Sequence, residues 1–140
     1  MGLLNRGSLL KREDLKIEKV DLGNEEFIFV RQMTGRERDQ FEKSLFKEVV
    51  DKKGRPDYER NLSDFRAKLA VNTVCDEKGN MLLNPDDYEQ LSKSMSAYRL
   101  EKIVNAAQKL NNITDDDKEG LVKNSGGDQP AASNSGLQKN

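Results

Sequence analysis

The acidic run Asp115-Asp116-Asp117-Lys118-Glu119-Gly120 comes nearest to a metal site in this chain. A calcium-binding EF-hand loop takes oxygen ligands at positions one, three and five, glycine at six and a bidentate glutamate at twelve. The run fits the first half of that pattern, but its position twelve is Gly126. An acidic helix start explains the run better, because carboxylates stabilise the positive end of a helix. We therefore expect no metal and no cofactor.

The usual groups of enzyme chemistry are scarce in the sequence. The chain has no histidine and one cysteine, Cys75, which excludes His-based triads, Cys/His zinc sites and an intrachain disulfide. Carboxylate pairs such as Asp86-Asp87 are adjacent in sequence, whereas acid–base catalysis needs two carboxylates facing each other across a pocket. The glycines at 23, 35, 54 and 79 stand singly and form no phosphate-binding loop. We predict that the chain is not an enzyme.

The charge balance argues against nucleic acid and membrane partners. The 140 residues carry a net charge of -1, so no overall field draws the chain to an anionic surface. The basic residues between Arg31 and Arg38 are interleaved with acids, and no apolar run is long enough to cross a membrane. The single cysteine fits a reducing cytoplasm. Only 34% of the residues are hydrophobic and the mean hydropathy is -0.87, which predicts that part of the chain does not pack.

The run Phe27-Ile28-Phe29-Val30 is the best candidate for a binding surface. Its unbroken apolarity means that both faces of a strand need cover, whereas a two-stranded hairpin packed on helices is covered on one face. Two interpretations stay open. The run forms the core and its other face tolerates exposure, or it is a docking edge for a partner strand or another copy of the protein. The residues that we predict to contact partners are Phe27, Phe29 and Arg31 on the hairpin and Phe46 on the first helix.

The elements that position these residues follow from hydrophobic period and turn signals. We predict a flexible N-terminal arm over 1–13, a single α+β domain, mainly α, over 14–123, and a disordered tail over 124–140. A β-hairpin over 15–33 packs on a small bundle of four to five helices in this interpretation. Gly23-Asn24 supplies the hairpin turn. The apolar alternation of the first strand slips phase at Glu18-Lys19, which indicates a bulge.

Helices are predicted at about 35–51, 57–75, 85–92, 94–111 and 115–123. The first begins at the capping box formed by Thr34 and Glu37. The second has apolar residues around much of its circumference, which is typical of the most buried helix of a domain. The fourth ends at Asn111-Asn112-Ile113, with asparagine in the left-handed position that glycine usually holds.

Several phrases of the second half resemble one protein family. They are Cys75-Asp76-Glu77-Lys78-Gly79-Asn80-Met81-Leu82, then Asp86-Asp87-Tyr88-Glu89-Gln90-Leu91, then Lys93-Ser94, and finally Asn105-Ala106-Ala107-Gln108-Lys109-Leu110-Asn111-Asn112-Ile113-Thr114. Together with the hairpin and the Thr-capped helix, they resemble the tail assembly chaperones of long, non-contractile-tailed bacteriophages and related prophage elements. The resemblance spans roughly Leu15 to Asn124. One departure is Asn112, where the family pattern has glycine.

The resemblance implies a non-enzymatic, mostly helical protein of the host bacterium's cytoplasm that is absent from the mature virion. Such proteins bind the tape measure protein, keep it soluble and help to recruit the major tail tube protein. Self-association would let several copies coat one extended partner. In the family a ribosomal frameshift often appends a second domain. The alternatives are a head–tail connector or tail terminator subunit that stays in the virion, and a small cytosolic adaptor.

Overall fold

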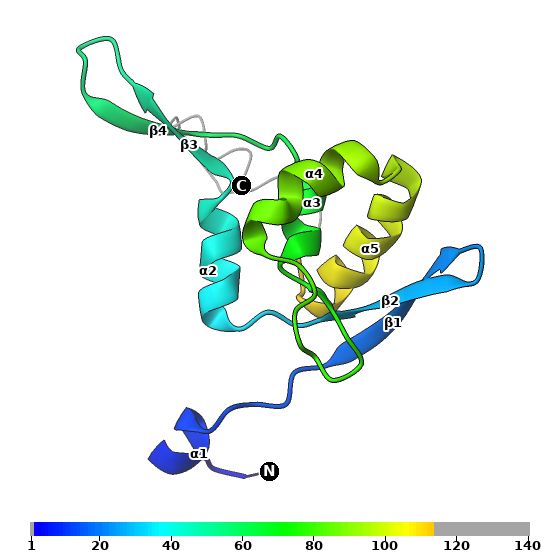
Figure 1. The fold of residues 1–140 in the computed structure, drawn as a ribbon. Coiled ribbons are helices and arrows are strands. Elements are labelled where there is room, and N and C mark those ends of the chain that lie inside the picture. The colour runs from blue at the N-terminus through cyan, green and yellow to red at the C-terminus, as the bar shows by residue number, and fades with distance from the viewer. Residues whose placement is uncertain (1, 114–140) are drawn as a thin grey trace, which may run out of the picture.

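The computed structural model describes residues 2–113 of the chain (Figure 1). The predicted α+β fold is confirmed, because helices pack on a small antiparallel sheet near the N-terminus. The predicted helix over 115–123, the acidic run within it and the predicted tail over 124–140 lie outside the described residues. No helix among the described residues is both long and apolar enough to cross a membrane.

The predicted hairpin over 15–33 is confirmed. Strand β1 (Ile17–Gly23) pairs antiparallel with β2 (Glu26–Arg31), and β5 (Val74–Cys75) pairs with the other edge of β2. The predicted bulge at Glu18-Lys19 is wrong, because the register shifts between Asp21 and Gly23. The irregularity lies beside the turn, where the backbone takes positive φ at three successive residues beginning with Gly23.

Two helices separate the two halves of the hydrophobic core. Helix α3 (Phe65–Val71) and helix α5 (Ala97–Leu110) bring one set of side chains to the inner face of the sheet and a second set to α2 (Gly35–Lys43). The sheet-side cluster contains Val20, Leu22, Val30, Ala70, Val74, Leu100 and Ile103. The cluster beside α2 contains Phe41, Leu45, Phe65, Leu69, Val104, Ala107 and Ile113. The prediction of a helix buried on most sides is confirmed for α3, within narrower bounds.

The later helices follow their predicted caps. The region predicted as helix 85–92 contains a 3-10 turn, η1 (Pro85–Asp87), and helix α4 (Tyr88–Ser94). Helix α5 begins three residues later than predicted, because the Ser96 hydroxyl accepts a hydrogen bond from the Arg99 N–H. The predicted left-handed stop is confirmed, since Asn112 has a φ of 54° and the buried Ile113 donates its N–H to the Gln108 carbonyl at 2.8 Å.

Two predicted helices are wrong over the segment between Ser44 and Asp64. Helix α2 begins at the predicted capping box of Thr34 and Glu37 but ends at Lys43, and the chain then forms β3 (Phe46–Val50). Strand β4 (Pro56–Arg60) pairs antiparallel with β3 and occupies the start of the predicted helix 57–75. The ammonium of the buried Lys68 donates to the Ser44 carbonyl at 2.8 Å and so satisfies the end of α2.

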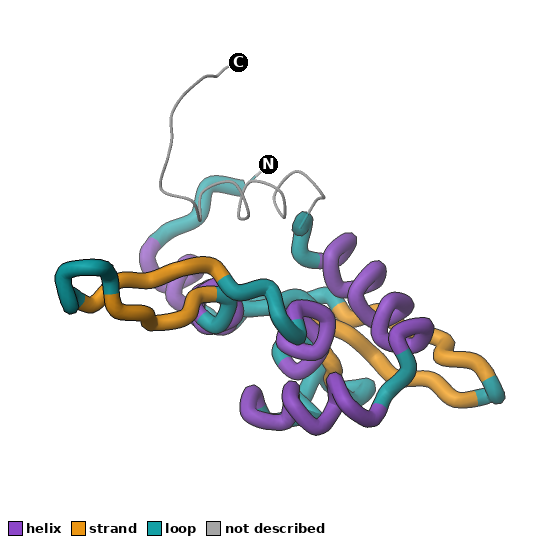
Figure 2. Tube along the Cα trace, turned by 90° about the horizontal axis from the view of Figure 1, so that it is seen from above, coloured by secondary structure: helices purple, strands orange, loops and turns teal. Residues whose placement is uncertain are grey.

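The turn at Asp51 is the physical reason for this second hairpin. Its carboxylate accepts hydrogen bonds from the Lys53 and Arg55 N–H groups at 2.8 and 2.9 Å, and Gly54 has a φ of 78°. Pro56 fits at the start of β4 because its missing N–H points to the free edge. Figures 1 and 2 show the β3–β4 hairpin projecting from the body at the end opposite the β1–β2 turn.

The N-terminal segment lies apart from the core. The predicted flexible arm contains a short helix, α1 (Arg6–Leu10), which begins at the N-cap Asn5 and has no buried residue. Its exposed leucines are Leu3, Leu4, Leu9 and Leu10. In Figure 1 α1 stands away from the helices and both hairpins.

Candidate protein-binding surface

The first candidate surface is the outer face of the β1–β2 hairpin near its turn. Phe27 is 50% exposed, and its ring meets that of Phe29 edge to face, with 5.8 Å between centroids. The Lys19 ammonium lies 4.2 Å from the Phe27 centroid, a cation–π contact that holds the ring against β1. Ile28 and Val30 point to the opposite face and join the core. The core interpretation of the apolar run is therefore confirmed, since one face packs and the other is exposed. The docking interpretation stays a prediction for the exposed Phe27 side.

The other end of this outer face, beside Phe29, is covered by β5 and the segment that follows it. Phe29 is half-buried and pairs across the sheet with Cys75, whose thiol is buried. Burial raises the pKa of the Cys75 thiol, which keeps it protonated and unreactive near neutral pH. Met81 bridges to Cys75, and the Gly79 backbone approaches the Ile17 side chain. The free part of this face is thus limited to the Phe27 end.

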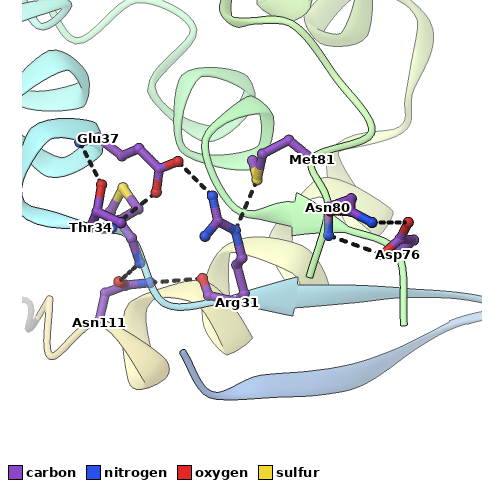
Figure 3. Close-up of polar contacts among 8 residues, drawn as sticks. Arg31, Thr34, Glu37, Asp76, Asn80, Met81 and Asn111 are labelled. Atoms are coloured by element: carbon purple, nitrogen blue, oxygen red, sulfur yellow. Dashed lines mark hydrogen bonds and ion pairs between the residues drawn. The ribbon is translucent and has the colours of Figure 1, made fainter. Parts of the chain in front are cut away.

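Arg31 lies at the covered end, and only 4% of it is exposed. Its Nη2 donates to the Glu37 carboxylate at 2.5 Å and its Nε to the Met81 sulfur at 3.0 Å (Figure 3). Glu37 also accepts the Thr34 N–H at 2.9 Å in the capping box of α2. Arg31 therefore joins β2 to the start of α2, and its guanidinium is not presented on the surface for a partner.

The second candidate surface, called here the β3–β4 apolar face, was missed by the sequence interpretation apart from Phe46. It comprises the side chains that share one face of the projecting hairpin: Phe46, Glu48, Val50, Pro56, Tyr58 and Arg60. Phe46 is 40%, Tyr58 66% and Val50 71% exposed. Phe46 lies in a strand, so it belongs to this face instead of a helix as predicted. Apolar side chains exposed side by side on a hairpin are typical of a contact surface.

Arg60 supports the base of the β3–β4 apolar face. Its guanidinium carbon lies 5.3 Å from the Phe46 ring centroid. Its Nε and Nη1 atoms are buried without a hydrogen-bond partner, and burial lowers the pKa of Arg60. Phe46 is therefore backed by a cation, which fixes the ring's position at the root of the hairpin.

The signal that predicts this hairpin is present in the sequence. Asp51-Lys52-Lys53-Gly54-Arg55 and Asp76-Glu77-Lys78-Gly79-Asn80 share the pattern Asp-x-Lys-Gly-x, and the two turns have the same hydrogen bonds. In each, the aspartate N–H donates to the carbonyl four residues later at 2.9 Å, and the carboxylate accepts two backbone N–H groups. The pattern that forms a turn at Asp76 thus also forms a turn at Asp51.

The described residues contain no group of three or more histidine, cysteine or acidic side chains placed to hold a metal ion. The predicted partner contacts Phe27 and Phe29 lie together on one hairpin, and Phe46 lies on the other hairpin at the far end of the molecule (Figure 2). The structure does not bring the predicted contact residues into one site. It divides them between two separate aromatic surfaces.

The chain was compared with protein families, curated proteins and solved structures. No family model matches the chain, and neither a curated protein nor a solved structure is similar to it.

Proposed function

We propose that this chain is a non-enzymatic phage tail assembly chaperone that binds the tape measure protein and promotes polymerisation of the tail tube. The sequence phrases between Cys75 and Thr114 carry the resemblance to that family. Its place of action would be the cytoplasm of the bacterial host, and it would leave the tail before the virion is complete.

The observation that carries this proposal is the pair of aromatic surfaces on a charge-rich chain. Charged residues make up 35% of the sequence, yet Phe27, Phe46 and Tyr58 each expose 40% or more of their surface. A carrier of an aggregation-prone helical chain needs apolar contact surfaces on a well-solvated body. Because the surfaces lie at opposite ends of the molecule, one copy would contact a long partner at two separated points (Figure 1).

Co-expression with the tape measure protein of the same genome tests the binding. We expect the soluble yield of the tape measure protein to rise several-fold and the two proteins to co-purify. Replacing Phe27 and Phe46 together by serine should weaken the complex by roughly tenfold or more, because exposed aromatic anchors dominate protein interfaces. The matched control is Tyr98→Ser, since Tyr98 is 68% exposed on α5 and belongs to neither surface. No co-purification of the native chain would reject the proposal.

Mass spectrometry of purified virions tests the departure of the chaperone from the finished tail. We expect no peptides of this chain. A stoichiometric amount would favour a head–tail connector or tail terminator subunit. A genome without a tape measure reading frame nearby would favour a small cytosolic adaptor.

A further inference from the structure

Three strands of the described fold, β1, β3 and β4, have one edge without a neighbouring strand. Strand β1 is the outer strand of the order β1-β2-β5, and the β3–β4 hairpin is a separate two-stranded sheet. An exposed strand edge carries unpaired N–H and C=O groups that can pair with another strand. The question is which residues carry those groups and which strand they fit.

The hydrogen-bond pattern fixes which residues face each free edge. The residues directly before and after β3 bond to those that flank β4, through Asn61 N–H to Leu45 O and Asp51 N–H to Arg55 O. Because alternate residues point to opposite edges, the backbone groups of Phe46, Glu48 and Val50 point away from β4. These three side chains also lie on the β3–β4 apolar face.

The same reasoning applies to β1. The Gln32 N–H bonds to the Lys16 carbonyl, so Lys16 and the residues two and four further on face β2. The backbone groups of Ile17, Lys19 and Asp21 therefore point to the free edge. Their side chains share the outer face of the sheet with Phe27 and Phe29. The free edge of β4 is less suitable, because Pro56 lacks the N–H that would point outward.

We propose that β3 of one copy of this chain pairs antiparallel with β1 of a second copy, with Glu48 opposite Lys19 and Val50 opposite Ile17. This register sets opposite charges and two β-branched side chains against each other. A shift by two residues in one direction would place Glu48 opposite Asp21, a like-charge pair, and a shift in the other direction would place Glu48 opposite Ile17 and lose the opposite-charge pair. In the proposed register the β3–β4 apolar face and the outer face with Phe27 and Phe29 become one continuous sheet face.

Charge disfavours the pairing of two β3 strands with each other. Two β3 strands paired antiparallel about their centre place Glu48 opposite Glu48. Two β1 strands paired about their centre at Val20 place Lys19 opposite Asp21, which charge does not disfavour, but this pairing leaves the free edge of β3 uncovered. Like charges directly opposite each other destabilise a strand pair. The pairing of β3 with β1 covers the free edge of each strand and sets Glu48 opposite Lys19, so β1 of a second copy is the occupant that we assign to β3.

The two edges cannot meet within one molecule. The β3–β4 hairpin and the β1–β2 hairpin project at opposite ends in both views (Figures 1 and 2). Pairing of β3 with β1 of the next copy is head to tail, so each added copy again presents one free edge of each kind. We expect a concentration-dependent series of oligomers, or a ring, instead of a closed two-fold dimer.

A charge swap tests the register by sedimentation equilibrium of the full chain. Glu48→Lys and Lys19→Glu should each raise the apparent dissociation constant about tenfold, because each creates a like-charge pair. The double variant restores an opposite-charge pair and should return the constant to within about threefold of the native value. Lys52→Glu is the matched control, because the exposed Lys52 lies in the turn of the same hairpin and outside β3. It should leave association unchanged.

Edge-blocking variants test the head-to-tail order. Glu48→Pro and Lys19→Pro each remove an outward N–H and leave the hairpin hydrogen bonds in place. Each variant alone should be monomeric, whereas an equimolar mixture should form a dimer and nothing larger. Circular dichroism checks that both are folded, and the charge swap decides the question where a proline variant is not.

The proposal is overturned by a native chain that stays monomeric at all concentrations, by single charge variants that associate like the native chain, or by a double variant that is not rescued. It is also overturned by a proline variant that is folded and still dimerises alone. These readouts contain no tape measure protein, so their failure is distinct from failure of the chaperone function.

Discussion

The Arg31 guanidinium is shared between Glu37 on α2 and Met81 beyond β5. One side chain therefore joins three segments that are distant in the sequence. The Arg31–Glu37 ion pair is largely buried. Removing one partner would leave the other charge buried and unpaired, which costs free energy of folding. At the scale of single residues, the stability of the β2–α2 junction depends on this contact.

Arg31→Met should lower the free energy of unfolding by about 2 to 3 kcal/mol, because it removes charged hydrogen bonds and strands the Glu37 carboxylate. Urea unfolding at neutral pH measures the change. The control is Arg36→Met, an exposed neighbour on α2, which should alter stability by less than about 0.5 kcal/mol. Equal effects of the two substitutions would contradict the structural role of Arg31.

The two Asp-x-Lys-Gly-x turns link residue chemistry to hairpin stability at the scale of elements. The pKa of Asp51 is lowered mainly by the hydrogen bond from the Arg55 N–H, and the pKa of Asp76 by the bond from the Asn80 N–H. A carboxyl whose pKa is lower in the folded state stabilises that state when ionised. Each turn therefore stabilises the folded state most at pH values above the ordinary aspartate pKa.

The β3–β4 hairpin should lose stability as the pH falls from about 4 through the lowered pKa of Asp51, because protonation weakens the turn. Amide hydrogen exchange at Lys47 and Val49, which face β4, measures the opening of this hairpin. Asp51→Asn should remove that pH dependence, whereas Asp39→Asn on α2 should preserve it. A hairpin whose exchange protection falls equally in both variants would exclude Asp51 as the titrating group.

Sequence reasoning succeeded where the signal is local. The hairpin over 15–33, the capping box at Thr34 and the left-handed stop at Asn112 depend on residues a few positions apart. The β3–β4 hairpin was missed because Phe46, Val49 and Val50 fit a helical period as well as a strand, and the turn at Asp51 decides between them. The burial of Arg31 could not be predicted from nearby residues, because Met81, which contacts it, lies fifty residues later in the sequence.

At the scale of the whole molecule, the described chain is a packed body with three projections: the α1 arm and the two hairpins (Figure 1). The body contains both core clusters, and the projections carry most of the exposed large apolar side chains. Changes in the body should therefore alter folding, and changes in the projections should alter association.

Deletion of residues 2–10 should change the free energy of unfolding by less than about 0.5 kcal/mol, because α1 and its leucines have no packed partner. Thermal and urea unfolding measure this. Leu69→Ala, in the centre of the core, is the contrasting variant and should cost about 3 kcal/mol. A deletion as costly as that substitution would show that the arm packs on the body.

A cut in the projecting turn at Lys52 and Lys53 would divide the chain into two pieces that still share one hydrophobic core. Both lysines are exposed, while Leu45 before the hairpin and Phe65 after it are buried in the same cluster. Brief trypsin treatment should cut at this tip as well as at the exposed Lys11 and Arg12 of the arm. The two fragments of the body should part on a denaturing gel but elute together as one folded species. The tip is accordingly a permissive site, where a reporter domain can be inserted without dividing the core.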